Sequence, residues 1–294
     1  MRTLFRFMMC LAGGMGALTV QADTAANTTA QAQELDIMAM ERDAKSGLIL
    51  IHALVNNTPM RFMLDTGANR SILHHESAQK LKNVRWLSTA HIKFDSNSTQ
   101  RPKMLVAGLQ AGPGISPQHV FAVLDLSSVH SMMAEKIDGI IGMDVLGSLP
   151  FTFDFRKNEF YWGIPQDATL SPVYGTMEKV GRMMVHPKCG GKQLNLLLDT
   201  GSVITKVPAQ DWTAGSAGEI AARMGNVDST KCIKVEEGKP ADMEVAPRVL
   251  LRGVQPILCS PQESALLGLD AMREAILSHF PTEESVYGQF CFAL

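Results

Sequence analysis

The chain has 294 residues, of which 46% are hydrophobic and 19% charged, so it can bury cores of ordinary size and is not disordered in bulk. Its formal net charge is −2 and it contains no run of Lys or Arg, which argues against nucleic acid as a partner and against binding to an acidic membrane surface. The length allows two domains.

Residues 1–22 have the features of a secretory signal peptide. Arg2 and Arg6 give a positive start, Phe7–Val20 is apolar and rich in small residues, and Val20-Gln21-Ala22 has the small-residue cleavage pattern. The apolar stretch is short and interrupted by glycine, so we favour a signal peptide over the alternative, a membrane anchor. We therefore expect an exported protein, periplasmic or secreted, without stable membrane insertion, and a flexible lead at residues 23–46.

A strand-like pattern begins at residue 47 and leads to the first distinctive motif. The apolar segments Leu48–Val55 and Met60–Leu64 flank the turn Asn56-Asn57-Thr58-Pro59, which predicts a hairpin. The hairpin ends at Asp65-Thr66-Gly67, where the glycine supplies the backbone freedom that a tight loop needs. A short helix is expected after this loop, at His74–Lys82.

The second half of the chain repeats the first. The segments Met183–Pro187 and Leu194–Leu198 lead into Asp199-Thr200-Gly201. Further on, Leu266-Leu267-Gly268 mirrors Ile140-Ile141-Gly142 of the first half. This order indicates an internal duplication of one all-β unit, and hence an all-β, bilobal protein. The predicted parts are a first lobe at residues 47–165, a linker at 166–178 and a second lobe at 179–294.

Two such loops supply two carboxylates, which is what peptide hydrolysis by an activated water requires. One carboxylate can act as the base for the water while the other, protonated, acts as the acid for the carbonyl oxygen. Carboxylates about 3 Å apart cannot both ionise, so the pair shares one proton. Asp65 and Asp199 are therefore the predicted catalytic pair, and neither a cofactor nor a metal is expected.

The two motifs resemble those of the pepsin- and retropepsin-type aspartic proteases, with both halves in one polypeptide as in the pepsins. The resemblance covers Gly47–Trp162 and roughly Met183–Met272. It implies a pepsin-like double β-barrel with the active-site cleft between the lobes. It also implies an aspartic endopeptidase that acts as a monomer on peptide or protein substrates.

The resemblance assigns roles to the residues beside each Asp. Thr66 and Thr200 would form crossed hydrogen bonds beneath the carboxylates, and Gly67 and Gly201 would support those carboxylates. In the next position the first motif has alanine, whereas the second has Ser202, the one of the two that could hydrogen-bond its carboxylate. A substrate-binding flap is expected at Phe94, Asp95, Ser96 and Asn97, which lack the Tyr of the pepsin-type flap.

Four cysteines follow the predicted signal peptide, and all lie in the second half: Cys189, Cys232, Cys259 and Cys291. An even number in an exported chain favours disulfides. We predict that Cys232 pairs with Cys259 and Cys189 with Cys291, with other pairings inside the second lobe left open.

Two further features of the sequence are interpreted as structural and not as functional sites. His74-His75-Glu76 could suggest a metal site, but no second cluster completes it, so a solvent-exposed helix start is favoured. Asp144 and Asp270 each follow their Gly motif by two positions and are interpreted as helix caps.

The alternative function is a non-catalytic peptide- or protein-binding protein on the same fold, because a fold alone does not determine function. Both Asp-Thr-Gly triplets are intact, which favours the enzyme.

Overall fold

The computed structural model describes residues 36–93, 99–165, 169–178, 181–225, 230–282 and 285–294. Strands dominate this part of the chain. Its helical elements are short: α1 (His75–Lys80), α2 (Ser127–Met132), α3 (Met143–Leu146) and the 3-10 turn η1 (Ala209–Asp211). In the described residues no helix has the length and apolar character to cross a membrane. The predicted all-β class is confirmed.

The first half forms an eight-stranded sheet that closes on itself. Its strands, in spatial order, are β2 (Glu41–Arg42), β3 (Ile49–Val55), β4 (Thr58–Leu64), β11 (Gly139–Ile141), β5 (Ile72–His74), β10 (Gly114–Leu124), β9 (Lys103–Ala111) and β6 (Arg85–Thr89). An additional pairing of β3 with β9 joins six of them into a barrel. The predicted first hairpin is β3–β4, whose turn residues Asn56 and Asn57 both have positive φ.

The second half forms an eight-stranded and a four-stranded sheet. The first contains β15 (Gly175–Met177), β16 (Met183–Val185), β19 (Leu196–Leu198), β26 (Leu266–Leu267), β20 (Lys206–Pro208), β25 (Ile257–Cys259), β22 (Thr230–Gly238) and β21 (Ser216–Gly225). The second contains β18 (Lys192–Gln193), β17 (Lys188–Cys189), β23 (Ala241–Ala246) and β24 (Val249–Val254). A further two-stranded piece pairs β7 (Ile92–Lys93) with β8 (Thr99–Gln100).

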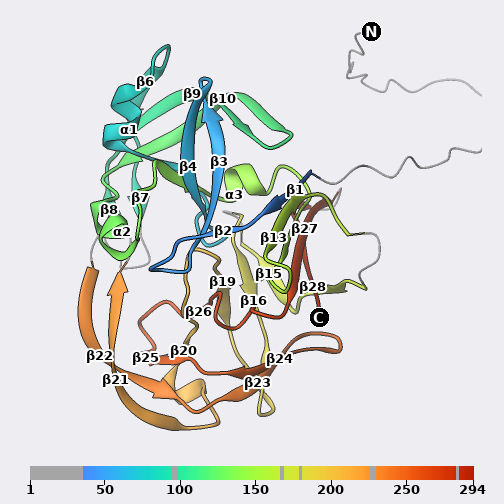
Figure 1. Cartoon of the computed structure of the whole chain (residues 1–294). Helices are drawn as coiled ribbons and strands as arrows, with labels where there is room; N and C mark the ends of the chain where they lie inside the picture. The colour runs from blue at the N-terminus through green and yellow to red at the C-terminus, as the bar shows by residue number, and fades with distance from the viewer. Residues whose placement is uncertain (1–35, 94–98, 166–168, 179–180, 226–229, 283–284) are drawn as a thin grey trace, which may run out of the picture. The chain divides into compact units, whose positions relative to one another are not determined.

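A six-stranded sheet joins the two halves. Its order is β1 (Asp36–Ala39), β13 (Glu159–Trp162), β12 (Phe151–Asp154), β27 (Ile276–Thr282), β28 (Ser285–Ala293) and β14 (Ser171–Pro172). The junction is the antiparallel pairing of β12 with β27, which sets Phe151 opposite His279. Figure 1 shows β1, β13, β27 and β28 gathered on one side, beside the strands of both halves.

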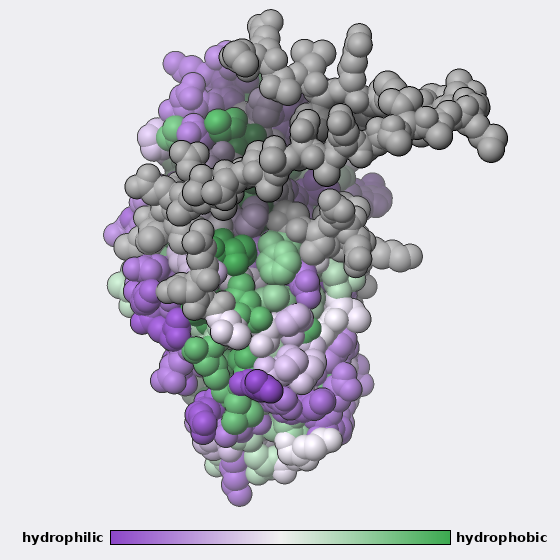
Figure 2. All heavy atoms as spheres, turned by 90° about the vertical axis from the view of Figure 1, so that its right-hand side faces the viewer, coloured by the Kyte–Doolittle hydropathy of each residue, from purple (hydrophilic) through white to green (hydrophobic). Residues whose placement is uncertain are grey.

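Buried side chains form one core that runs through both halves and a smaller one within the first half. The larger core includes Phe62, Phe153, Leu198 and Phe292, each fully buried. On the face seen in Figure 2, hydrophobic residues gather near the middle, whereas hydrophilic residues lie along the margins. The two lobes therefore share apolar packing as well as a sheet.

The predicted linker and the predicted flap lie outside the barrels. Part of the segment predicted to be a linker is in strand structure, since β14 pairs with β28 and β15 with β16. The predicted flap residues, Phe94 to Asn97, lie outside the described residues.

The predicted disulfides are wrong. Cys189, Cys259 and Cys291 are free, buried thiols, so neither the Cys189–Cys291 nor the Cys232–Cys259 bond is present. The three belong to three different sheets, which gives no pair of them a shared strand pairing. Burial raises the pKa of the Cys291 thiol to about 11, so this thiol stays protonated and serves as apolar packing.

Candidate active site

The two Asp-Thr-Gly loops occupy equivalent places in the two barrels. In the first, β11 runs parallel to β4 and opposes Ile141 to Leu64; in the second, β26 runs parallel to β19 and opposes Leu267 to Leu198. The Asp65 amide donates to Ile141 O at 3.0 Å. The Asp199 amide donates to Leu267 O, also at 3.0 Å. Each Asp therefore leaves its strand at the same point of the repeated unit.

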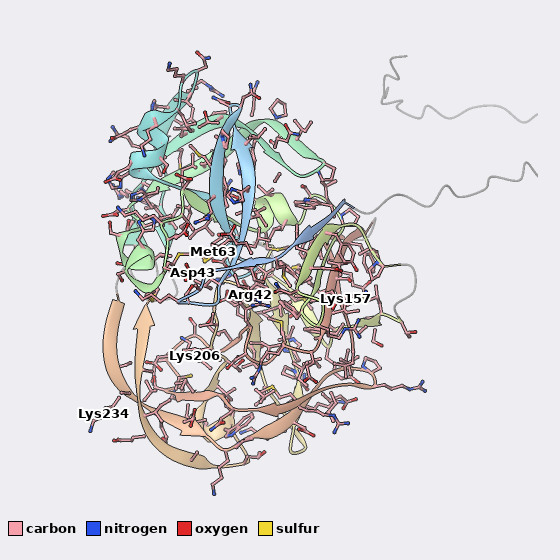
Figure 3. The ribbon with its side chains drawn as sticks, viewed as in Figure 1. Arg42, Asp43, Met63, Lys157, Lys206 and Lys234 are labelled. Atoms are coloured by element: carbon pink, nitrogen blue, oxygen red, sulfur yellow. The ribbon has the colours of Figure 1, made fainter. Side chains whose placement is uncertain are left out.

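The residues flanking the loops lie toward the centre of the molecule. Figure 3 shows Met63, just before the first loop, and Lys206, just after the second, in its central part, with Lys234 at the periphery. Met63 is buried. The loops thus sit where strands of the two halves approach one another.

Each apolar-apolar-Gly segment passes so close to its Asp loop that only glycine fits. A Cβ on Gly142 would lie 2.7 Å from Ala68 O, and one on Gly268 would lie 2.5 Å from Ile204 O. The next residues hold the contact, because Met143 N donates to Ala68 O at 2.8 Å. This close approach explains why the sequence repeats a glycine at both places.

Crossed hydrogen bonds join the two loops. Thr66 N donates to Thr200 Oγ1 at 3.0 Å, and Thr200 N donates to Thr66 Oγ1 at 3.1 Å. The hydroxyls in turn donate across the junction, from Thr66 to Leu198 O at 2.9 Å and from Thr200 to Leu64 O at 3.0 Å. Both threonines are buried, so these four bonds satisfy polar groups that water does not reach.

Each carboxylate packs against the glycine of the other loop. A Cβ on Gly67 would lie 2.7 Å from Asp199 Cγ, and a Cβ on Gly201 would lie 2.5 Å from Asp65 Cγ. Any larger side chain would collide with the opposite carboxylate. The tertiary structure therefore brings Asp65 and Asp199 to the same junction, from opposite sides.

Backbone amides orient the two carboxylates. Ala68 N donates to Asp65 Oδ1 at 2.9 Å, whereas Gly201 N donates to Asp199 Oδ1 at 2.9 Å. The Ser202 hydroxyl donates to Ile204 O at 2.9 Å. The role expected for Ser202 beside its carboxylate stays a prediction.

A half-buried carboxylate braces each loop. In the first half, Ser71 donates to Asp144 through its amide (3.0 Å) and its hydroxyl (2.7 Å), and Ser71 Oγ accepts from Gly142 N (3.1 Å). In the second half, Thr205 Oγ1 donates to Asp270 Oδ1 (2.5 Å) and accepts from Gly268 N (3.1 Å). The brace thus links the strand after each Asp loop to the glycine segment.

These carboxylates are not helix caps, as the sequence had suggested. Asp144 lies inside α3, whose N-cap is Gly142 without a side-chain cap bond. Asp270 precedes no helix in the described residues. Sequence reasoning missed the braces, but the repeat contained their signature: a hydroxyl residue six positions after each Asp, Ser71 and Thr205.

The two braces differ in their electrostatics. Burial raises the pKa of Asp144, but neighbouring His119 and the Ser71 donors outweigh it, so the pKa lies below its ordinary value. His119 Nε2 is 3.5 Å from Asp144 Oδ2. For Asp270, burial dominates over the bonds from Thr205, and the pKa is raised. The favourable contacts of the carboxylate therefore outweigh its burial in the first half, whereas burial prevails in the second.

The helix predicted after the first loop is present as α1, which begins at the half-buried His75 and continues with the exposed Glu76, whereas His74 is buried at the end of β5. His75 and the distant Asp125 lie beside it. Within the described residues, these three side chains form a group whose nitrogen and oxygen atoms could hold a metal ion.

Comparisons with known proteins agree with this geometry. Residues 51–145 match the model of a family described as aspartyl protease. Among 298 matching chains of solved structures is basic 7S globulin from soybean, at 13% identity and a TM-score of 0.55. That match covers 88% of this chain and 94% of the globulin. No curated protein sequence matches. The pepsin-like fold is confirmed, and so is the resemblance to the aspartic proteases.

Removal of the Thr200 hydroxyl is expected to destabilise the junction. Thr200→Val keeps the shape but leaves Thr66 N–H and Leu64 C=O buried without this partner, at a cost of about 2–4 kcal/mol in the free energy of unfolding. Thr200→Ser keeps the hydroxyl and is expected to cost only about 1 kcal/mol. Urea unfolding measures both; a Thr200→Val protein as stable as Thr200→Ser would contradict the assignment.

The two brace carboxylates are expected to respond differently to neutralisation. Because the folded-state pKa of Asp144 is lowered, its ionisation stabilises the fold above the unfolded pKa of about 3.9, and this stabilisation is lost as the pH falls through the folded pKa. The pKa of Asp270 is raised, so its ionisation costs stability at neutral pH. Asp144→Asn is therefore expected to lower the free energy of unfolding at pH 7 by about 1.5–3 kcal/mol, and Asp270→Asn by less than about 1 kcal/mol.

Urea unfolding at pH 7 and near pH 4 checks this pair. The difference between the two variants should shrink at the lower pH. A larger loss at pH 7 for Asp270→Asn than for Asp144→Asn would reverse the expected order and refute it.

Proposed function

The first lobe of this chain carries the aspartyl protease pattern on a pepsin-like fold, and on that premise we propose that the chain is an exported aspartic endopeptidase. Its substrates would be peptides or proteins, and Asp65 and Asp199 would be its catalytic residues. Both halves of the site come from one polypeptide, so the active form would be a monomer. No cofactor enters the proposed reaction.

In the proposed reaction one carboxylate is ionised and the other protonated. The ionised group takes a proton from water as the water oxygen attacks the peptide carbonyl carbon, while the protonated group hydrogen-bonds to the carbonyl oxygen. The tetrahedral intermediate then collapses with cleavage of the C–N bond, and the proton taken from water passes to the leaving amine. The two carboxyl groups exchange roles in each turnover.

The observation that carries this proposal is the reciprocal packing of the loops. Each carboxylate lies against the glycine of the opposite loop, above the crossed threonine bonds. Such packing places two carboxyl groups at one junction with fixed backbones beneath them. A rigid support of this kind is what general acid–base chemistry needs, because a small misplacement of either group lowers the rate.

The competing function is peptide or protein binding without hydrolysis. It stays the alternative because the same fold occurs in basic 7S globulin, whose name states no protease activity, and a fold does not determine function. A likeness at 13% identity supports the fold alone. The intact pair of Asp-Thr-Gly loops favours hydrolysis.

Peptide cleavage as a function of pH tests the proposal. Two carboxyl groups that share one proton give a bell-shaped rate profile, and its maximum is expected on the acid side of neutrality. Asp65→Asn and Asp199→Asn should each lower kcat/KM by roughly 10²–10⁴-fold. A pepstatin-like mimic of the transition state should bind the wild type and lose affinity for Asp65→Asn.

Asp211→Asn is the matched control, since this carboxylate pairs with Lys192 at 2.7 Å and belongs to neither loop. It should cleave like the wild type. If Asp199→Asn cleaved peptides as fast as the wild type, the shared-proton mechanism would be refuted. Binding of peptides by a wild type that cleaves none of them at any pH would favour the competing function.

Export is a separate part of the proposal and rests on the sequence of residues 1–22. Expression of the full chain should yield a processed protein outside the cytoplasm whose first residue is Asp23. N-terminal sequencing after cell fractionation measures this. A cytoplasmic product that still begins with Met1 would contradict export and leave the proposed chemistry untouched.

A further inference from the structure

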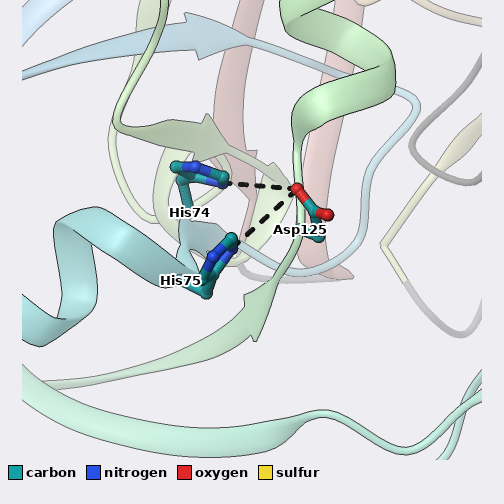
Figure 4. A group of neighbouring side chains, drawn as sticks. All are labelled: His74, His75 and Asp125. Carbon is teal, nitrogen blue, oxygen red and sulfur yellow. Dashed lines mark ion pairs between the residues drawn. The ribbon is translucent and has the colours of Figure 1, made fainter.

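Three side chains with metal-binding atoms converge at one corner of the first barrel. β10 runs parallel to β5 and sets Leu124 opposite His74. Asp125, the residue after this pair, therefore arrives beside His75, the first residue of α1. Figure 4 shows both imidazoles directed toward the Asp125 carboxylate from the neighbouring segment.

The distances suit a single small ion. His74 Nδ1 and His75 Nδ1 each lie 3.9 Å from Asp125 Oδ1. One such atom from each of the three residues lies within 4.8 Å of the others. A four-coordinate zinc ion with bonds of about 2.0–2.2 Å places its ligand atoms about 3.3–3.6 Å apart, so the three atoms must move together by about half an ångström or more. The side chains of His75 and Asp125, 42% and 64% exposed, have room for that movement.

One ligand atom lacks a hydrogen bond. His75 Nδ1 is buried and has no hydrogen-bond partner among the described residues. A buried nitrogen without a partner costs free energy, and an ion bound to its lone pair would remove that cost. This atom is the strongest indication that the cluster binds something.

The other two ligands are held in position by the backbone. Asp125 Oδ1 accepts from Ser127 N at 2.9 Å and from Ser127 Oγ at 2.6 Å, which orients the carboxylate and leaves Oδ2 available. His74 Nδ1 accepts a hydrogen bond from Leu126 N at 3.1 Å, so this nitrogen carries no proton. Leu126 is buried, so an ion bound at His74 Nδ1 has to displace this amide from the nitrogen.

A neighbouring histidine completes the surroundings. The His130 ring packs edge-on against His74 with centroids 4.7 Å apart, and its Nε2 lies 2.9 Å from Ile137 O. Hydrogen-bonded groups behind the ligands commonly fix their orientation in metal sites. His130 is thus positioned to support His74 rather than to bind the ion.

We propose that His74, His75 and Asp125 bind one zinc-like divalent transition-metal ion, with water in the remaining position. Two imidazoles and a carboxylate suit zinc, whereas magnesium and calcium take oxygen ligands. The ion would tie the start of α1 to the turn between β10 and α2. Its role is structural, and it is independent of the proposed hydrolysis.

The test uses the full mature chain without a polyhistidine tag, freed of metal by a chelator. Titration calorimetry with Zn²⁺ should give one site per chain, and the Tm should rise with Zn²⁺ concentration because the ion binds the folded state. Mg²⁺ should do neither. Co²⁺ should give the visible absorption of a four-coordinate site.

His75→Ala and Asp125→Asn should weaken Zn²⁺ binding roughly tenfold or more and abolish the Co²⁺ absorption. The two side chains are 42% and 64% exposed, so the variants should keep the fold, which far-UV circular dichroism checks. His91→Ala, at an exposed histidine, is the matched control and should bind like the wild type. Unchanged Zn²⁺ affinity in His75→Ala, or a Tm of the wild type that does not respond to Zn²⁺, would overturn the proposal.

Discussion

The structure depends on the four hydrogen bonds that cross between Thr66 and Thr200. These buried bonds join the two halves of the chain, each of which has its own strands. Every polar group in this set has its partner in the other half, so neither loop satisfies its backbone alone. Because an unpaired buried amide or carbonyl costs on the order of 1–3 kcal/mol, the junction constrains both halves to one relative arrangement. The position of both carboxylates follows from it.

The two halves repeat the same backbone elements, but the side chains around those elements differ. Both halves repeat the strand, the Asp loop, the glycine segment and the hydroxyl–carboxylate brace. The first brace has His119 beside Asp144, whereas the second holds Asp270 with Thr205. Consequently the pKa of Asp144 is lowered despite its burial, whereas burial raises the pKa of Asp270. Two copies of one architecture thus give the two loops different electrostatic supports.

The corner of the first barrel that holds His74, His75 and Asp125 illustrates how a strand pairing creates chemistry that the chain order conceals. The two histidines are adjacent in sequence, while the carboxylate is contributed by a strand that reaches β5 only through the parallel pairing of β10. A residue pattern that looked incomplete in the sequence becomes a three-ligand cluster in space. The cluster lies on the segment that follows the first Asp loop, so order at this corner bears on β5, which Ser71 directly precedes.

The fold class, the internal duplication and the two Asp-Thr-Gly loops could be predicted from the sequence, because these depend on local apolar patterns and on a motif that occurs twice. The sequence also contained the hydroxyl residues Ser71 and Thr205 at matching positions, although their partners could not be identified from spacing alone. Which atoms meet followed only from the pairing of distant segments, which sets Asp144 and Asp270 against Ser71 and Thr205 as braces of the loops and not as helix caps. The tertiary structure also left Cys189, Cys259 and Cys291 as separate buried thiols. The physical reason is that side-chain partners are set by the register of strands far apart in the chain, which composition and local periodicity do not specify.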